Sequence, residues 1–116
     1  GVIPFTTTSY SAAGAVAFGA AQWTTAIING TSALAMTLAD PDSSQDGIIL
    51  AIVANGKAAH TVTYTAGLGD AGSGYDVGTF DGSGQCCMLL TAANSSWVPL
   101  PSPMSGTLTA IDVAIA

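Results

Sequence analysis

The side chains that could act in catalysis are few in this chain. It has one histidine, His60, and all seven of its acidic residues are aspartates. Serine, histidine and aspartate together could form a nucleophilic hydrolase site, with the histidine as base. His60, however, alternates with Val62 and Tyr64, a setting typical of a neutral histidine with structural hydrogen bonds. The Gly-x-Ser-x-Gly motif is also missing. We therefore expect that the protein is not an enzyme and has no catalytic residues.

Three aspartates, Asp40, Asp42 and Asp46, lie within the segment DPDSSQDG. Clustered carboxylates are the ligands that hard cations such as Ca²⁺ prefer. The spacing departs from the calcium-loop signature, because a glycine follows the third aspartate and no glutamate closes the site. Aspartates also cap the backbone of ordinary turns. We expect turn chemistry and no metal, with a bound cation as the open alternative.

Cys86 and Cys87 are adjacent, so their side chains point to opposite faces of a strand. A disulfide between them would need a distorted peptide. With one histidine they supply too few ligands for a zinc site. We interpret them as small reduced hydrophobic residues, which fits synthesis in a reducing cytoplasm.

A glycine-rich stretch, residues 67–84, offers the other candidate for chemistry. Loops of this kind can bind phosphate, but the Lys-Ser/Thr pair that completes a phosphate-binding loop is missing here. The dinucleotide fingerprint between a strand and a helix is missing too. We interpret the stretch as a surface loop containing one short strand, and we expect no cofactor.

Two segments in the middle of the chain carry the strongest strand signals. Residues 48–54 are an uninterrupted apolar run, typical of a strand buried on both faces. Residues 59–65 alternate with period two, as in a half-buried strand. Between them stands Asn55-Gly56, a strong two-residue hairpin signal. The pattern predicts a central hairpin made of these two strands.

The remaining segments predict an all-β protein. Further strands are expected at residues 12–21, 23–28, 33–38, 77–80, 86–93, 97–100 and 107–116. Pro99, Pro101 and Pro103 place the strand at 97–100 at a sheet edge or in a linker. Residues 12–21 are too short for a membrane helix and lack the basic flank of a signal peptide. The prediction is one antiparallel β-sandwich or barrel, residues 9–116, with glycine-rich loops.

Charge is scarce throughout the chain. Only 7% of its 116 residues are charged, against about a quarter in typical globular proteins. One Lys, no Arg and a net charge of −6 argue against binding to nucleic acid or to an anionic membrane. Interface cores are depleted in charge, so we expect a homo-oligomer.

The N-terminal residues 1–8 predict an extended arm. The segment is apolar at Val2, Ile3 and Phe5, and Pro4 favours an extended backbone. These four residues show no periodic pattern that would predict a locally folded element. We expect these four residues to form an interface with a neighbouring subunit or a larger partner; a frayed terminus is the alternative. Gly1 is expected to follow a removed Met or a trimmed leader.

Three stretches carry a resemblance to a known group of proteins. They are DGIILAIVANGKAAHTVTYTAGLG, DVGTFDGSG and CCMLLTAANSSWVPL. They resemble small structural proteins of tailed bacteriophage virions, namely head-decoration, head-fibre and related capsid-associated proteins. The resemblance spans residues 46–100, roughly half of the chain. Ser95 stands where the hairpin of those proteins has glycine.

The resemblance implies a structural role on the virion. It implies an all-β protein, made in the host cytoplasm and most often trimeric, that binds the major capsid protein and decorates the outer surface of the head. One alternative is a receptor- or glycan-binding module of a tail or fibre, whose aromatic patch would come from Trp23, Tyr75 or Trp97. The other is a surface fibre subunit that polymerises by exchanging its N-terminal arm.

Overall fold

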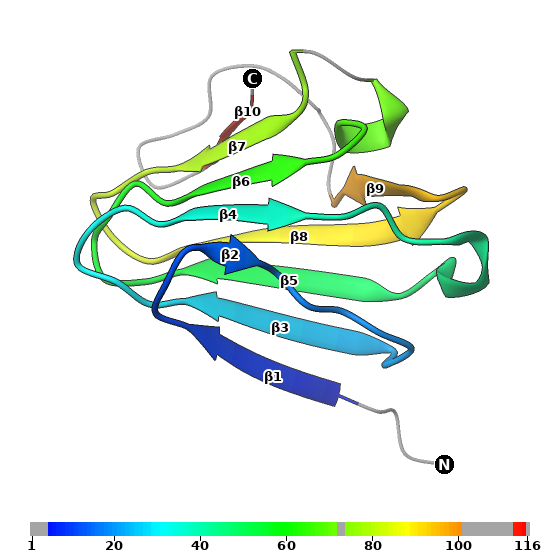
Figure 1. Ribbon diagram of the computed structural model, residues 1–116, viewed down its shortest axis with the longest axis horizontal. Coiled ribbons are helices and arrows are strands. Elements are labelled where there is room, and N and C mark those ends of the chain that lie inside the picture. The colour runs from blue at the N-terminus through cyan, green and yellow to red at the C-terminus, as the bar shows by residue number, and fades with distance from the viewer. Residues whose placement is uncertain (1–4, 72–73, 101–112, 116) are drawn as a thin grey trace.

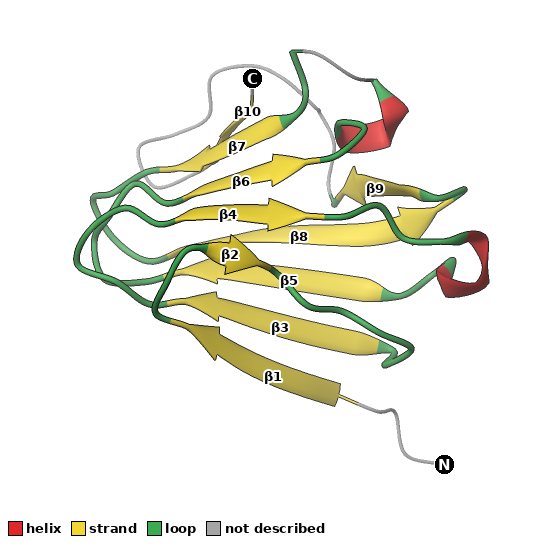
Figure 2. Cartoon of the chain, viewed as in Figure 1, coloured by secondary structure: helices red, strands yellow, loops and turns green. Residues whose placement is uncertain are grey.

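The computed structural model of the protein describes residues 5–71, 74–100 and 113–115 (Figure 1). Strands are the main regular structure of the described chain, accompanied by two short 3₁₀ helices, η1 (Ser43–Gln45) and η2 (Leu68–Asp70) (Figure 2). The strands are β1 (Phe5–Tyr10), β2 (Gly14–Ala15), β3 (Trp23–Ile28), β4 (Ala35–Leu38), β5 (Ile49–Ala54), β6 (Thr61–Tyr64), β7 (Val77–Phe80), β8 (Cys86–Ala93), β9 (Ser96–Pro99) and β10 (Val113–Ile115). The all-β prediction is confirmed. In the described chain, neither helix has the length and apolar character needed to cross a membrane.

The strands form two five-stranded sheets. Sheet A has the order β1-β3-β5-β8-β9, and sheet B has the order β10-β7-β6-β4-β2. From β1 to β6 the chain crosses from one sheet to the other after every strand, so that β1, β3 and β5 pair in parallel, as do β2, β4 and β6 (Figure 1). The prediction of antiparallel sheets is therefore wrong for the first six strands.

The predicted central hairpin is wrong for a related reason. Both edges of β5 are occupied, one by β3 and the other by β8. The strand after Asn55-Gly56 therefore has no free edge of β5 on which to fold back. It joins sheet B instead, where β6 pairs with β4 and β7.

The strand pair β5 and β6 repeats the pair β3 and β4 with an offset of 26 residues, whereas Phe5 of β1 pairs with Trp23, only 18 residues further on. Trp23 pairs with Ile49 in sheet A, and Ala35 pairs with Thr61 in sheet B. The two Asn-Gly turns consequently stack: Asn55 Nδ2 donates to Asn29 Oδ1 at 2.7 Å, across |i−j| = 26. Gln85 Nε2 extends this ladder by donating to Asn55 Oδ1 at 2.8 Å. Stacked amide side chains thus fasten three successive strand ends to one another.

The second half of the chain closes the stack with antiparallel strands. Strand β7 pairs with β6, β8 pairs with β5, and β9 pairs with β8. Asn94 and Ser95 join β8 to β9 with φ of 52° and 63°, the two positive values that a type I′ turn requires. As Pro99 predicts, β9 is an edge strand.

One hydrophobic core lies between the sheets. Leu50, Ile52 and Leu90 of sheet A and Met36, Leu38 and Val62 of sheet B are almost fully buried in the same cluster. Trp97 of β9 reaches towards the other sheet, because its Nε1 donates to the carbonyl of Ala39, just after β4, at 2.9 Å. The edge of the Phe18 ring packs against the Trp97 ring, with 5.0 Å between ring centroids.

The N-terminal third departs from the predicted elements. The strand expected at residues 12–21 is reduced to the two residues of β2, after which the chain runs past Val16 and Phe18 without strand pairing. The arm expected at residues 1–8 overlaps β1, because residues 5–8 already pair in parallel with β3. Of the final strand expected at residues 107–116, the described part is β10.

Candidate docking surface

The outward face of sheet A is mostly apolar, and its hydroxyl-bearing residues are Thr7, Ser9, Thr25, Thr91 and Ser96. Period-two alternation turns Leu50, Ile52 and Ala54 of β5 into the core, so the intervening side chains point outwards. The same alternation holds in β3 and β8. We call the outward apolar set the A face; it comprises Phe5, Trp23, Ile27, Ile49, Val53, Leu89 and Val98.

The strand register brings these side chains into rows across the sheet. Phe5 lies beside Trp23, and Trp23 beside Ile49. The rings of Phe5 and Trp23 are in tilted contact, with centroids 6.1 Å apart. A second row runs from Ile27 to Val53. Five strands about 4.8 Å apart and six residues of about 3.3 Å each give the A face a footprint of roughly 480 Å².

Exposure separates the A face from the core. Phe5 is 65% exposed, and the other members are half-buried. On the outward side, the prediction that residues 48–54 are buried on both faces holds at Ala51 and is wrong at Ile49 and Val53, which are half-buried. The apolar run reflects a core on one side and an uncovered surface on the other.

The outward face of sheet B has a different chemistry. Thr37, Thr61, Thr63 and Thr79 lie there, and their hydroxyl groups can bond to water. Val62 and Tyr64, the intervening residues of β6, are buried. The molecule therefore has one outer face that is mostly apolar and one in which threonine predominates.

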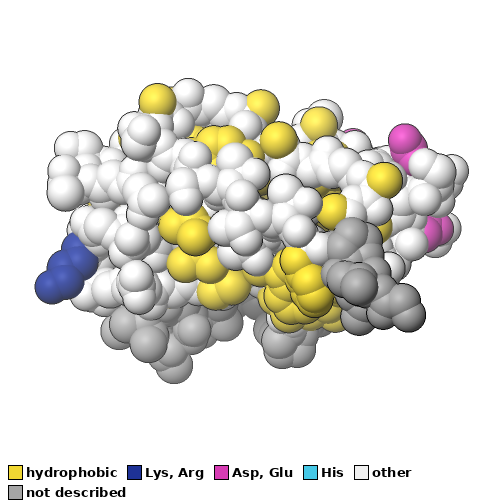
Figure 3. Space-filling view, turned by 90° about the horizontal axis from the view of Figure 1, so that it is seen from below, with side chains coloured by type: hydrophobic (Ala, Val, Ile, Leu, Met, Phe, Trp, Pro, Cys, Tyr) yellow, Lys and Arg dark blue, Asp and Glu magenta, His cyan; other side chains and the backbone are white. Residues whose placement is uncertain are grey.

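Charge is confined to the ends of the molecule. Every charged residue that the structure describes lies in a loop, a turn or a 3₁₀ helix, and none of them lies in a β-strand. Seen from the β1 side, a basic side chain is visible at one end and acidic side chains at the other, with hydrophobic patches between them (Figure 3). The A face therefore presents no charge that a partner would have to desolvate.

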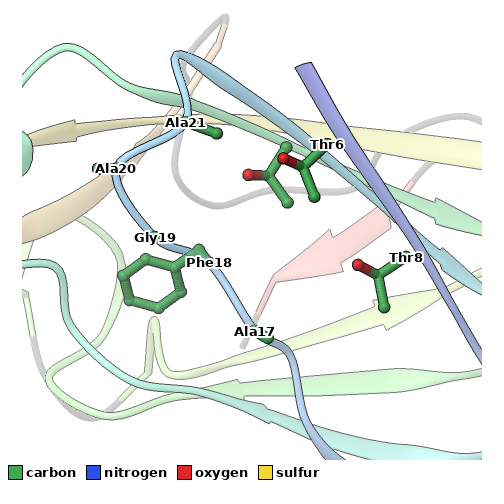
Figure 4. A pocket seen from close by; sticks show the side chains of 8 residues that line it. Thr6, Thr8, Ala17, Phe18, Gly19, Ala20 and Ala21 are labelled. Carbon is green, nitrogen blue, oxygen red and sulfur yellow. The ribbon is translucent and has the colours of Figure 1, made fainter. Parts of the chain in front are cut away.

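A shallow groove lies at the edge of sheet A, on the inward side of β1 and so opposite the A face. It has a volume of about 280 Å³ and lies between β1 and the segment that follows β2. Thr6 and Thr8 form one wall, and the chain at Ala17–Ala21 forms the other, while the Phe18 ring points away from the threonines (Figure 4). The described residues that line this groove carry no charge.

The predicted interface residues fall only partly within the described chain. Val2, Ile3 and Pro4 lie outside it, whereas Phe5 is the first residue of β1 and belongs to the A face. The other members of the A face come from strands whose outward residues the sequence pattern does not assign to an interface. The available signal is the outward apolar pair in each strand, Trp23 with Ile27 and Ile49 with Val53.

His60 has the structural role that its context predicts. Its ring is fully buried. Nδ1 accepts a hydrogen bond from the amide of Leu34 at 2.9 Å, so Nε2 carries the proton and donates to the carbonyl of Asn55 at 2.8 Å. Both nitrogens of the ring are thus engaged by the backbone of two stacked turns.

The three clustered aspartates bind backbone amides in the turns. Asp42 caps η1 by accepting from the amide of Ser44 at 2.8 Å. Asp46 accepts from the amide of Asn94 at 2.9 Å, and Asp40 from that of Ala66 at 3.4 Å. Among the described residues, no group of three or more His, Cys, Asp or Glu side chains could hold a metal ion.

The cysteines, the glycine-rich stretch and the candidate glycan-binding aromatic residues lie in different parts of the fold. Cys86, which is half-buried, and Cys87, which is exposed, are not joined to each other by a disulfide. The glycine-rich stretch contains β7, as predicted, and Phe80 anchors it in the core. Of the three aromatic residues proposed for a glycan patch, Trp97 is 1% exposed and faces inwards, whereas Trp23 and Tyr75 are half-buried.

No protein-family model, no curated protein and no solved structure matches this chain.

Proposed function

We propose that this protein is a structural virion protein that decorates the outer surface of a tailed-phage head. In this proposal the two sheets form a β-sandwich whose A face binds the major capsid protein and whose threonine-rich face meets solvent. The single observation that carries it is the contrast between these two outer faces. A decoration protein needs one adhesive side and one inert side.

The size of the A face indicates how strongly one copy would bind. At about 25 cal/mol per Å² of apolar surface, a footprint of roughly 480 Å², which also includes threonine and serine side chains, would contribute at most about 12 kcal/mol if it were fully buried. Association itself costs about 4–15 kcal/mol. One copy would therefore bind weakly, and stable decoration requires several linked copies, as in a homo-oligomer.

The N-terminal segment is part of the proposed contact. Phe5 is strongly exposed and packs beside Trp23 at the margin of the A face. In the proposal, Val2, Ile3 and Pro4 extend this apolar surface. A variant without residues 1–5 should remain folded by circular dichroism and lose occupancy on heads; full occupancy would remove this segment from the contact.

The decisive experiment places a charge on each outer face in turn. Val53→Lys puts a cation in the centre of the A face, and Thr63→Lys is the matched control on the exposed face of β6. Both variants should fold. Phage heads stripped of the protein are incubated with each variant, and bound protein is quantified. We expect Val53→Lys to bind at least tenfold more weakly than wild type and Thr63→Lys to bind normally.

Two results would contradict the proposal. One is undiminished binding of Val53→Lys, and the other is loss of binding by Thr63→Lys alone. The alternative function, a glycan-binding module, is less favoured because the inward-facing Trp97 cannot contribute to an aromatic platform.

A further inference from the structure

The four sheet edges of the described chain are not equally protected. Natural proteins protect edge strands from pairing by making them short or by placing proline or charge on them. In sheet B the edge strands β2 and β10 have two and three residues. In sheet A the edge strand β9 has four residues and ends in Pro99. The fourth edge, β1, has six residues, FTTTSY, without charge or proline.

The free backbone groups of β1 can be assigned from one hydrogen bond. The carbonyl of Tyr10 accepts a hydrogen bond from the amide of Asn29, just after β3, at 2.7 Å. The N–H and C=O groups of Tyr10 therefore point towards the β3 side of β1. Successive residues of a strand direct these groups to opposite sides. Phe5, Thr7 and Ser9 therefore point their N–H and C=O groups away from β3, where no described strand of sheet A lies.

We propose that β1 pairs with β1 of a second copy of this chain, antiparallel and around a two-fold axis at Thr7. Two-fold pairing within one continuous sheet keeps outward side chains outward in both copies. It sets Thr7 opposite Thr7, and Phe5 opposite Ser9. These are the residues with free backbone groups, and each opposed pair can exchange two hydrogen bonds.

The side chains are compatible with this register. Thr6 of one copy comes opposite Thr8 of the other on the inward side, and threonine pairs across strands are stabilising. The groove lined by Thr6 and Thr8 then lies at the new junction and can be closed from both sides. The strand carries no charge, so two copies meet without repulsion. The β1 strand of a second copy thus matches this edge in its backbone hydrogen-bonding groups, its threonine side chains and its lack of charge.

The pairing would also enlarge the A face. Because the two-fold axis is perpendicular to the sheet, both A faces lie on the same side of one continuous ten-stranded sheet. Their combined footprint is roughly 960 Å², above the about 800 Å² per partner of a standard interface. The pairing itself concerns the isolated protein, so it can be tested without the proposed function.

The test measures self-association of the purified full chain by sedimentation equilibrium. Wild type should reach twice its 11.4 kDa chain mass at micromolar concentration. Thr7→Lys places two cations opposite each other at the axis, and Thr7→Asp places two anions there. Each variant alone should dissociate at least tenfold more readily, and an equal mixture of the two should dimerise again. Thr63→Lys introduces the same side chain at an exposed position of β6, away from the proposed contact, and should behave as wild type.

Thr7→Pro gives a second, independent variant, because it removes an N–H that points away from β3. It should be folded and monomeric. A wild-type monomer, a wild-type trimer, or a dimer that Thr7→Lys does not weaken would each overturn the inference. If Thr7→Pro does not fold, the Lys/Asp mixture still decides the matter: failure to restore the dimer would overturn it.

Discussion

At the scale of single residues, buried polar groups distinguish structural roles from chemical ones. Both ring nitrogens of His60 have backbone partners, and the clustered aspartates bind backbone amides. Tyr64 differs, because its hydroxyl is buried and has no hydrogen-bond partner among the described residues. Burial raises the pKa of this phenol above its ordinary value.

Tyr64→Phe should leave the protein as stable as wild type or more stable by about 1 kcal/mol, because it removes a buried hydroxyl without a partner. Thermal or urea unfolding measures the change.

The stability of the wild type should also depend on alkaline pH, because the pKa of Tyr64 is raised in the folded state. The contribution of the neutral phenol to the free energy of unfolding is fully present below the pKa of the unfolded chain, near 10, and is lost as the pH rises above that value. Wild type should therefore unfold at lower alkaline pH than Tyr64→Phe. A loss of more than about 1 kcal/mol in the variant at neutral pH would show that the hydroxyl is bonded.

The stacked Asn-Gly turns provide a second prediction at this scale. Gly47 and Gly56 have nearly equal φ, 90° and 86°, so alanine strains the backbone similarly at both positions. A Cβ at Gly56 would lie 1.9 Å from the carbonyl oxygen of Gly30, whereas a Cβ at Gly47 meets nothing within 4 Å. Gly47→Ala should cost about 1–2 kcal/mol. Gly56→Ala should cost clearly more in urea unfolding, since the turns must separate. Equal losses would mean that the two turns are not in contact.

At the scale of elements, β5 is the strand on which sheet A depends. It is the third of five strands and pairs with β3 on one side and β8 on the other. Its inward residues are core, and its outward residues belong to the A face. Adjacent residues of β5 therefore alternate between the hydrophobic core and the A face.

This difference predicts unequal effects at adjacent residues. Leu50 is fully buried, so Leu50→Ala should lower the free energy of unfolding by about 2–5 kcal/mol. Ile49 is half-buried and points outwards, so Ile49→Ala should cost about 1 kcal/mol or less in the isolated subunit. Denaturant unfolding of both variants makes the comparison. An equally large loss at Ile49 would place the outward face of β5 in a core.

At the scale of the whole molecule, the two outer faces differ in chemistry. The A face is apolar, the face of sheet B is rich in threonine, and the described charges lie in loops, turns and 3₁₀ helices. Large exposed apolar patches on soluble proteins are typical of interaction sites. The scarcity of charge in the composition is thus linked to a particular surface.

A dye that fluoresces on apolar surfaces should detect the A face directly. We expect Val53→Lys to reduce dye binding by the isolated protein by about half or more, because a charge interrupts the patch. Thr63→Lys should have no effect, since it lies on the threonine-rich face. Equal dye binding by all three proteins would show that the A face is covered in solution.

From residue 23 onwards, local patterns in the sequence predict most of the strands, whereas β1 and β2 differ from the predicted elements. Residues 23–28 and 86–93 are strands at the predicted boundaries, and the half-buried strand predicted at 59–65 agrees with the burial of Val62 and Tyr64 and the exposure of Thr63. Alternation is readable because it follows from the backbone of one strand. The environment of His60 and the edge position of β9 follow from equally local signals.

The tertiary structure alone decided which strands pair and what lies outside them. Asn55-Gly56 is a hairpin signal in isolation, but β3 and β8 already occupy both edges of β5, so the chain crosses to sheet B. The apolar run at 48–54 could not reveal that only one of its faces is covered by this chain. Of the A face, only Phe5 was predicted as an interface residue. Which strands pair, and which faces of a sheet are covered, depends on residues that are distant in the sequence. These residues can occupy the same strand edge or sheet face, so the outcome is fixed only when the whole chain has folded.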